Sequence, residues 1–565
     1  MQVRNMLRKY GMSAILTAVV MVVSTTTAMA QRYNDLPPMP GDPVPTAAPS
    51  AAPADFPAMP GDPAPVAATP ADFPPMLGDP MPGTVPAMAL SPVQTLLKTE
   101  WAPAPEPTAT DRRAVFDRLR DQWWPIVEEM RQLQSEYRLP TTAVARQAEI
   151  RTRFTELSSQ SEAIVPLVAR AALEAYCQDT TKNADLFDLL STHIVDGVQH
   201  DRPEESLRFC QRMIDARTDS PMPAAWAAVL AVRLGDPEMA KQYLAVSDAI
   251  RIAASAGNPE DPATPENEKE MTAGDFLYAY LQMAATSDDY EVAYELAKLL
   301  VSIDYQGDWF PAFAGYAAYC VNDFDMAETQ LKKAQEQKWL TPRQGDDIIA
   351  MARAALMTPL PNGTMHTLAD SRKEWETESV IRAAEAAAGE ADPEKALPRV
   401  KVYTNKGNVV VELFEDQAPT AVANFLTLVE KGYYANVPFH RVLPGFMAQG
   451  GDPDGTGGGG PGYCIRSEFT RPDARKHFRG TLSMARTEFP DTEGSQFFLC
   501  FTPTKSLDGN YTAFGRIVEG FDVLAKIQRV NPKTPDPTIV PDKILKAEVL
   551  HKRNHPYTFE KLPER

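Results

Sequence analysis

Residues 439–452 read FHRVLPGFMAQGGD, the strongest local signal in this chain of 565 residues. Pro444-Gly445 is a turn signature, and the residues on either side of it predict two short strands. Because alternate side chains of a strand point to the same face, Arg441, Met447 and Gln449 are expected to share one wall. The pattern therefore predicts a fixed cation beside an apolar slot.

Two further blocks follow this stretch. They read SMARTEFPDTEGSQFFLCFT at Ser483–Thr502 and LDGNYTAFG at Leu507–Gly515. In this order and spacing, the three blocks resemble the cyclophilin-type peptidyl-prolyl cis-trans isomerases over about Arg399–Arg553. The resemblance implies a mainly-β closed barrel with two helices, and an enzyme that accelerates the isomerisation of X-Pro bonds.

The resemblance also implies roles for single residues. Arg441 matches the catalytic residue, and Gln449 matches the residue that holds this arginine and the substrate carbonyl. The matching proline pocket consists of Phe446, Met447, Phe498, Leu507 and Tyr511, and the matching peptide contacts are the backbone of Ala485 and Arg486 and the side chain of Gln496. Arg486 replaces a common asparagine, and Ser506 stands where cyclosporin-sensitive members carry tryptophan.

Local patterns in this segment agree with such a barrel. Asn405-Lys406-Gly407 lies between two alternating runs and predicts a hairpin. Thr420 is expected to cap a helix that ends near Gly432, and Phe521–Val530 is expected to form a second helix. The glycine-rich run Gly455–Gly462 lacks the helix and the Lys-Ser/Thr of a phosphate loop, so we expect a flexible loop beside the pocket.

The N-terminal region reads as an export signal followed by a spacer. Basic residues, an apolar run at Met12–Val23 and an A-x-A site predict a signal peptide at 1–30, and the apolar run of 12 residues is too short to span a bilayer. Residues 31–107 are rich in Pro and Ala and contain three related phrases, beginning at Asp35, Asp55 and Asp72. We expect a disordered, polyproline-like stalk there, either a plain spacer or a docking site for a partner.

Residues 108–389 are predicted to be helical. Asp111 is a suitable N-cap for a helix over Arg112–Tyr137. Small residues with similar surroundings recur at Ser206, Ala240, Ala293 and Ala327; two of the three spacings are 34 residues, and the third is lengthened by a polar loop at Asn258–Glu270. These units resemble tetratricopeptide repeats, which bind extended protein segments; a generic bundle of helical hairpins is the alternative. A hinge at 390–398 and a tail at 554–565 complete the domain prediction.

The composition excludes several classes of protein. The net charge is −19 and the pI is near 5, which disfavours binding to nucleic acid or to an anionic membrane. The segment Arg399–Arg553 carries 20 basic and 17 acidic side chains, so the acidity lies elsewhere. Five cysteines in apolar surroundings predict buried thiols, with a Cys177–Cys210 bridge left open. The seven histidines lack metal-ligand spacing, so we expect neither metal nor cofactor.

The sequence thus predicts an exported isomerase, periplasmic or in the cell envelope or secreted, that acts on proline-containing polypeptides. Its helical repeats would bind a protein partner, and no transmembrane span is expected after signal cleavage. Two alternatives remain. One is a catalytically idle barrel used as a peptide-binding or chaperone module, and the other is a cell-envelope scaffold.

Overall fold

The computed structural model describes residues 91–99, 101, 104–137, 144–199, 202–216, 218–255, 272–341, 347–360, 363–534 and 539–564. The expected signal peptide, most of the expected stalk and the loop Asn258–Glu270 lie outside these residues. The described chain forms a helical domain followed by an antiparallel β-barrel, which confirms the predicted order of fold classes. No helix in these ranges is both long enough and apolar enough to cross a membrane.

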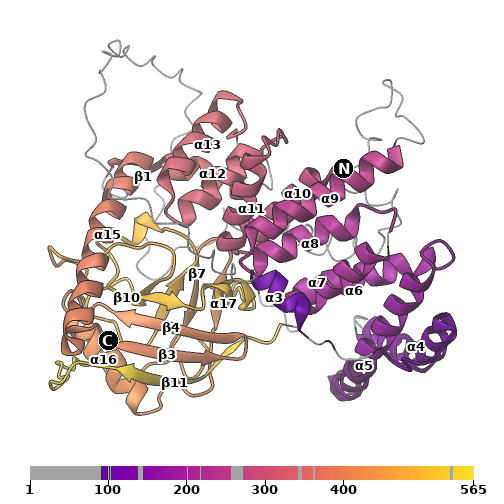
Figure 1. Ribbon diagram of the computed structural model, residues 1–565. Helices are drawn as coiled ribbons and strands as arrows, with labels where there is room; N and C mark the ends of the chain where they lie inside the picture. Colours follow the sequence, from indigo (N-terminus) through magenta and orange to yellow (C-terminus); the bar gives the residue numbers. More distant parts are fainter. Residues whose placement is uncertain are drawn as a thin grey trace, which may run out of the picture.

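The helical domain is a curved array of antiparallel helices (Figure 1). Its helices are α3 (Pro92–Lys98), α4 (Arg112–Tyr137), α5 (Val144–Gln178), α6 (Phe187–Gln199), α7 (Pro203–Asp215), α8 (Met222–Arg233), α9 (Pro237–Ser255), α10 (Ala273–Thr286), α11 (Tyr290–Ser302), α12 (Phe310–Cys320), α13 (Phe324–Glu336) and α14 (Asp347–Leu356), with a 3₁₀ turn η1 (Ala184–Leu186) before α6. The N–H of Ala114 donates to the Asp111 carboxylate over 3.1 Å, so the predicted cap of α4 is present.

Within the described part of the helical domain, four helical hairpins follow one another: α6–α7, α8–α9, α10–α11 and α12–α13. Ser206, Ala240, Ala293 and Ala327 each occupy the fourth position of the second helix of a hairpin, and each is at most 1% exposed. A small residue at this place lets the two helices of a hairpin approach closely. The spacing found in the sequence therefore marks one structural position repeated four times.

The predicted stalk ends earlier than the sequence suggested. Helix α3 lies inside the segment 31–107 and packs on the helical domain. The side chain of Val93 is fully buried, and its N–H donates to the Asp236 carboxylate over 3.3 Å. Trp101 lies under the Arg170 guanidinium, 3.5 Å from the ring centre, and edge-on to Phe209. These long-range contacts hold the segment in place and could not be read from its Pro-rich composition.

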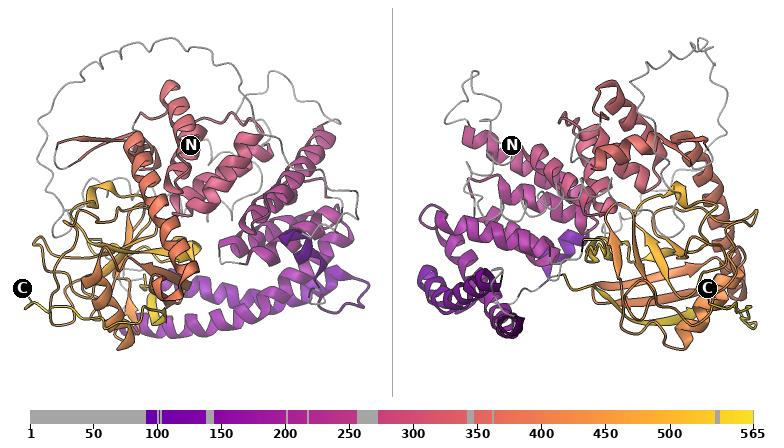
Figure 2. Two further views of the ribbon diagram at one scale, coloured as in Figure 1. Left: turned by 60° about the vertical axis from the view of Figure 1, so that its left-hand side comes forward. Right: turned by 180° about the vertical axis from the view of Figure 1, so that it is seen from behind.

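A short hairpin and one long helix connect the two domains. Strands β1 (Met357–Pro359) and β2 (Met365–Thr367), which the sequence did not suggest, pair antiparallel. Helix α15 (Leu368–Ala391) starts at a capping box made by Thr367 and Asp370 and ends two residues beyond the predicted end of the helical region at residue 389. It runs along the side of the barrel (Figure 2), and the 3₁₀ turn η3 (Pro393–Lys395) then leads into the first barrel strand.

In the residues that the structure describes, the barrel is one antiparallel sheet of nine strands. They are β3 (Arg399–Thr404), β4 (Gly407–Leu413), β5 (Val437–Pro438), β6 (Arg441–Leu443), β7 (Met447–Gly450), β8 (Thr481–Met484), β9 (Phe497–Cys500), β10 (Ala513–Glu519) and β11 (Lys543–His551), in the order β5-β11-β3-β4-β10-β8-β9-β7-β6. The first and last strands of this order, β5 and β6, are separated by only two residues in the chain, so the two edges of the sheet lie close together and the sheet is curled into a barrel. The predicted hairpin at Asn405–Gly407 joins β3 and β4.

The two barrel helices are α16 (Pro419–Glu430) and α17 (Phe521–Lys526). Thr420 is not the cap of α16. Instead, the carboxylate of Glu468, 48 residues away, accepts the N–H groups of Thr420 and Ala421 over 3.1 and 3.0 Å. Helix α17 is shorter than predicted because Val530, its expected last residue, bonds to Val442 of β6.

The C-terminal tail and the cysteines complete the fold. Leu562 of the tail pairs with Cys464, so the tail lies on the barrel surface. All five cysteines are free thiols. Four of them are buried and Cys177 is half-buried, which agrees with the prediction of buried thiols and leaves Cys177 and Cys210 unbridged.

Candidate active site

The predicted catalytic wall is formed by β6 and β7. In their pairing Arg441 faces Gln449 and Leu443 faces Met447, as the Pro444-Gly445 turn requires. A guanidinium nitrogen of Arg441 donates to the Gln449 side-chain oxygen over 3.3 Å. The amide nitrogen of Gln449 donates in turn to the Gln496 side-chain oxygen over 3.0 Å. A chain of polar contacts therefore holds the arginine side chain on this wall.

An apolar cluster lies on the other side of the arginine. Its buried members are Leu443, Met447, Ala485, Phe498, Cys500, Leu507 and Tyr511, and Phe446 packs on them while partly exposed. The Arg441 guanidinium carbon lies 5.9 Å from the Phe446 ring centre. Phe498 and Tyr511 meet edge to face, with ring centres 5.8 Å apart. All five residues predicted for the proline pocket are thus brought together from three separate segments.

A polar cavity of about 370 Å³ opens beside this cluster. Of the predicted site residues it is lined by Arg441, Gln449, Ala485, Arg486 and Gln496, together with the glycine-rich run. Arg441 borders both the cavity and the apolar cluster. The site therefore has two halves, one that suits an apolar ring and one that suits a peptide backbone, with a permanent cation between them.

Two of the residues predicted to contact the peptide make bonds within the barrel. The N–H of Ala485 donates to the Gln496 carbonyl over 2.9 Å, so this donor is used within the sheet. The Arg486 guanidinium donates to the Asn510 carbonyl over 2.7 Å and lies 4.8 Å from the Tyr511 ring centre. The Arg486 side chain thus braces the pocket, and the backbone contact that the resemblance implies for Ala485 and Arg486 stays a prediction.

The glycine-rich loop is held in place. The buried carboxylate of Asp452 accepts the N–H groups of Asp454, Thr456 and Gly457 over 2.8, 3.0 and 2.6 Å. Burial alone would raise the pKa of Asp452, but bonds from the backbone of Gly459, Asp454 and Gly457 hold it below its usual value. Gln496 also donates to two carbonyls of the loop. The glycine-rich loop therefore forms a wall of the cavity and is bonded to Asp452 and Gln496.

Several cavity residues were missed by the sequence reasoning. His440 lines the cavity directly before Arg441 and is 8% exposed. Burial lowers its pKa; the Asp452 charge opposes this shift and the Arg441 charge adds to it. His440 lies within the stretch 439–452, directly before Arg441, so its place in the sequence could have indicated that it lines the cavity. Pro532 and Lys533 also line the cavity, but they come from a distant loop without any motif.

A buried Ser–His–Asp arrangement stabilises the apolar side of this site. The His477 ring contacts Asp508 over 2.8 Å and Ser483 over 3.0 Å. Ser483 and His477 are both fully buried, so no substrate can reach this serine and the geometry is not that of a hydrolase. Asp508 follows Leu507 directly. The contact therefore ties the segment that carries Leu507 to strand β8.

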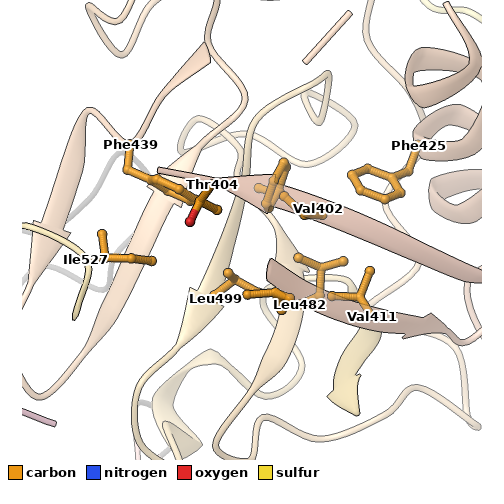
Figure 3. A pocket seen from close by; sticks show the side chains of 10 residues that line it. Val402, Thr404, Val411, Phe425, Phe439, Leu482, Leu499 and Ile527 are labelled. Carbon is orange, nitrogen blue, oxygen red and sulfur yellow. The ribbon is translucent and has the colours of Figure 1, made fainter. Parts of the chain in front are cut away.

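The interior of the barrel is a separate, closed core (Figure 3). Side chains from the strands and from α16 converge there, among them Val402, Val411, Phe425, Phe439 and Leu499. The remaining void is about 10 Å³, about the size that one water molecule needs. The barrel therefore works as a packed scaffold, and its chemistry is placed on the outer wall.

Comparison with known proteins places these features in a family context. A family model described as "Cyclophilin type peptidyl-prolyl cis-trans isomerase/CLD" matches residues 399–549. A peptidyl-prolyl cis-trans isomerase of Helicobacter pylori is 52% identical over 130 residues, which cover 23% of this chain and 78% of the relative. The peptidyl-prolyl cis-trans isomerase ppi1 of Schizosaccharomyces pombe is 41% identical over 157 residues, 27% of this chain and 100% of the relative.

Among solved structures, a cyclophilin type peptidyl-prolyl cis-trans isomerase of Cryptosporidium parvum is similar. The identity is 36%, the match covers 28% of this chain and 99% of that one, and the TM-score is 0.25. The segment that the family model covers is the barrel that carries the wall and the cavity described above.

Proposed function

Since the chain belongs to the family of cyclophilin-type peptidyl-prolyl cis-trans isomerases, we propose that its barrel isomerises X-Pro bonds in exported polypeptides and that its helical domain binds protein segments. The observation that carries the catalytic part is the position of Arg441 between an apolar cluster and a polar cavity. The proline ring would occupy the apolar side, and the flanking peptide would lie along the cavity.

The chemistry follows from the electronic structure of the peptide bond. Twisting an X-Pro bond sacrifices amide resonance, with a barrier of about 18–20 kcal/mol. In the twisted state the prolyl nitrogen regains a lone pair, and Arg441 can donate a hydrogen bond to it. Because the planar ground state lacks this lone pair, such a bond lowers the barrier selectively. Each 1.36 kcal/mol gained in this way accelerates the reaction about tenfold.

Gln449 has the second role in this proposal. Its oxygen accepts from the Arg441 guanidinium, so it fixes the direction of the donor before substrate binds. The glycine-rich wall, pinned by Asp452, keeps the cavity in shape. Preorganised donors need no rearrangement during the reaction, which increases their effect on the transition state.

Turnover measurements on the full chain test the catalytic proposal. Exchange between cis and trans forms of a proline tetrapeptide can be followed by NMR for the parent, Arg441→Ala and Arg441→Lys. We expect Arg441→Ala to lose about 10²-fold in kcat/KM, as for other preorganised donors, and Arg441→Lys to recover part of the loss. Arg466→Ala is the matched control, because Arg466 is exposed and pairs with Glu560 away from the wall. Turnover of Arg441→Ala at the parental rate would contradict the proposed role of Arg441, whereas a parent without turnover would leave an idle peptide-binding barrel instead.

The four hairpins support the second part of the proposal. Stacked helical hairpins present a continuous surface on which an extended segment can lie. A labelled unfolded polypeptide should bind to the full chain and remain bound when excess proline tetrapeptide occupies the barrel site. Complete displacement by the tetrapeptide would assign all binding to the barrel.

Export is proposed from the pattern of residues 1–30. N-terminal sequencing of the protein isolated from its natural host should give Gln31 as the first residue. A chain that still begins at Met1 in the cytoplasm would contradict this part of the proposal.

A further inference from the structure

The helical domain contacts the barrel through complementary charges. Acidic side chains of the helical part and of α15 face basic side chains of the barrel, in the pairs Asp288–Arg529, Glu291–Arg479, Glu374–Lys505, Glu378–Arg475 and Glu385–Arg516. The barrel residues of these pairs are 2–17% exposed in their side chains. The two domains therefore form one docked unit, and the docking surface reaches the catalytic wall.

One of these contacts falls on the turn that joins β6 to β7. Asp288 lies in the tight turn between α10 and α11, has a positive φ of 62° and is 1% exposed. Its carboxylate accepts the N–H of Gly445 over 2.8 Å. The carbonyl of Gly445 is bonded by Thr502 of the barrel over 2.9 Å. The N–H of Gly445 therefore bonds to the helical domain, and its carbonyl bonds to the barrel.

The carboxylate of Asp288 also holds the segment Arg529–Val530, which pairs with β6. Its second oxygen accepts from the Arg529 guanidinium over 2.6 Å. The next residue, Val530, exchanges backbone bonds of 2.8 and 3.0 Å with Val442 of β6. Asp288 therefore fixes both the turn after β6 and the segment that pairs with β6, and Arg441 is the first residue of that three-residue strand.

Packing reinforces this contact. Met351 of α14 lies against the turn, so close that a Cβ added to Gly445 would come within 2.9 Å of its sulfur. Gly445 has a φ of +67°, in the left-handed region where glycine is favoured. The turn thus has little room to move while the helical domain is docked.

From these contacts we infer that Asp288 is a positioning residue for isomerisation. Through Asp288, the helical domain holds the strand that carries Arg441. Misplacing a catalytic group by about 1 Å can cost as much as 10²-fold in rate. The barrel of this chain therefore reaches full activity only with the helical domain docked. The inference rests on the proposed isomerase activity, but its structural half can be measured separately.

The test uses the full chain with Asp288→Ala, Asp288→Asn and the control Asp289→Asn. Asp289 is the adjacent buried carboxylate and pairs with Arg233 inside the helical domain over 3.0 Å. Two quantities are measured: kcat and KM with a proline tetrapeptide, and hydrogen exchange of the backbone in residues 441–450.

We expect Asp288→Ala to lower kcat about tenfold with a smaller change in KM, and to speed exchange in 441–450 but not in 273–302. Asp288→Asn keeps an acceptor for Gly445 and loses the charge for Arg529, so intermediate values are expected. Asp289→Asn should keep the parental kcat.

Parental kcat and exchange in a folded Asp288→Ala would overturn the inference, as would an equal loss of kcat in Asp289→Asn. If Asp288→Ala does not fold, Asp288→Asn decides: a lowered kcat with faster exchange in 441–450 supports the inference, and parental values refute it. A parent chain without any turnover would instead contradict the proposed function, while the exchange data would still report on the Asp288 contact.

Discussion

Removal of Arg475 should uncouple the two domains. Its guanidinium is 2% exposed and donates to both carboxylate oxygens of Glu378 over 2.8 and 2.7 Å, and to Glu385 over 2.5 Å. It also lies 4.0 Å from the ring centre of Phe414. Glu378 and Glu385 belong to α15 and Arg475 to the barrel, so Arg475→Ala leaves two acidic groups at the interface without this partner.

The size of the effect follows from burial. Breaking a buried ion pair by deleting one partner costs about 3–5 kcal/mol, because the remaining charge stays desolvated. Glu378 is 4% exposed and keeps only its contact with Arg382 in the same helix. A loss of this size is comparable to the total stability of many domains. We therefore expect the helical domain and the barrel of Arg475→Ala to unfold in separate steps.

The distribution of tryptophan provides the assay. All seven tryptophans precede Arg399, so tryptophan fluorescence reports on the helical part, whereas hydrogen exchange of the backbone in strands β3 and β4 reports on the barrel. In a thermal or urea titration the two signals should change together in the parent and separately in Arg475→Ala. Arg471→Ala is the control, since Arg471 pairs with Asp473 at the barrel surface, where such pairs contribute about 1 kcal/mol or less. Coincident transitions of Arg475→Ala at the parental midpoint would refute the reasoning.

The same contact predicts a dependence on pH. Burial raises the pKa of Glu378, but the bonds from Arg475 outweigh it, so the pKa lies below its usual value of 4.5. A carboxyl group with a lowered pKa stabilises the folded state above its unfolded pKa, and this contribution is lost as the pH falls through the folded pKa. The parent should therefore show separate transitions only in acid, well below pH 4.5.

Two further predictions concern the barrel. Ser506 is exposed beside the buried Leu507, and Ser506→Trp should bind cyclosporin one to two orders of magnitude more tightly at similar turnover. The reason is that about 50 Å² of new contact contributes roughly 1 kcal/mol and an indole hydrogen bond adds a similar amount. Equal inhibition of the parent and the variant by cyclosporin would contradict this prediction. Glu493 is fully buried, and burial raises its pKa to about 8, opposed by the hydroxyl of Thr512, so its contribution to stability is complete below about pH 4.5 and declines as the pH rises to 8. Between pH 5 and pH 7.5 the free energy of unfolding in urea should therefore fall by on the order of 3 kcal/mol less in Glu493→Gln than in the parent. Superimposable plots of this free energy against pH for the two proteins would rule the prediction out.

The sequence alone determined the local elements and the composition of the site. The turn at Pro444-Gly445 fixed the pairing of Arg441 with Gln449, because side chains alternate along paired strands. The recurrence of small residues such as Ala293 and Ala327 located the helical hairpins, since each hairpin needs close contact at the same position. Such signals are readable because they depend on residues close together in the chain.

The tertiary structure decided how these parts are held. Arg475 and Glu378 are 97 residues apart, and Gly445 and Asp288 are 157 apart, so no periodicity in the sequence connects them. The same holds for Glu468, which takes the capping place predicted for Thr420, and for Val93, whose burial ends the predicted stalk. Charged and backbone groups accept any complementary partner that the fold brings within about 3 Å, and their residue type does not specify which one.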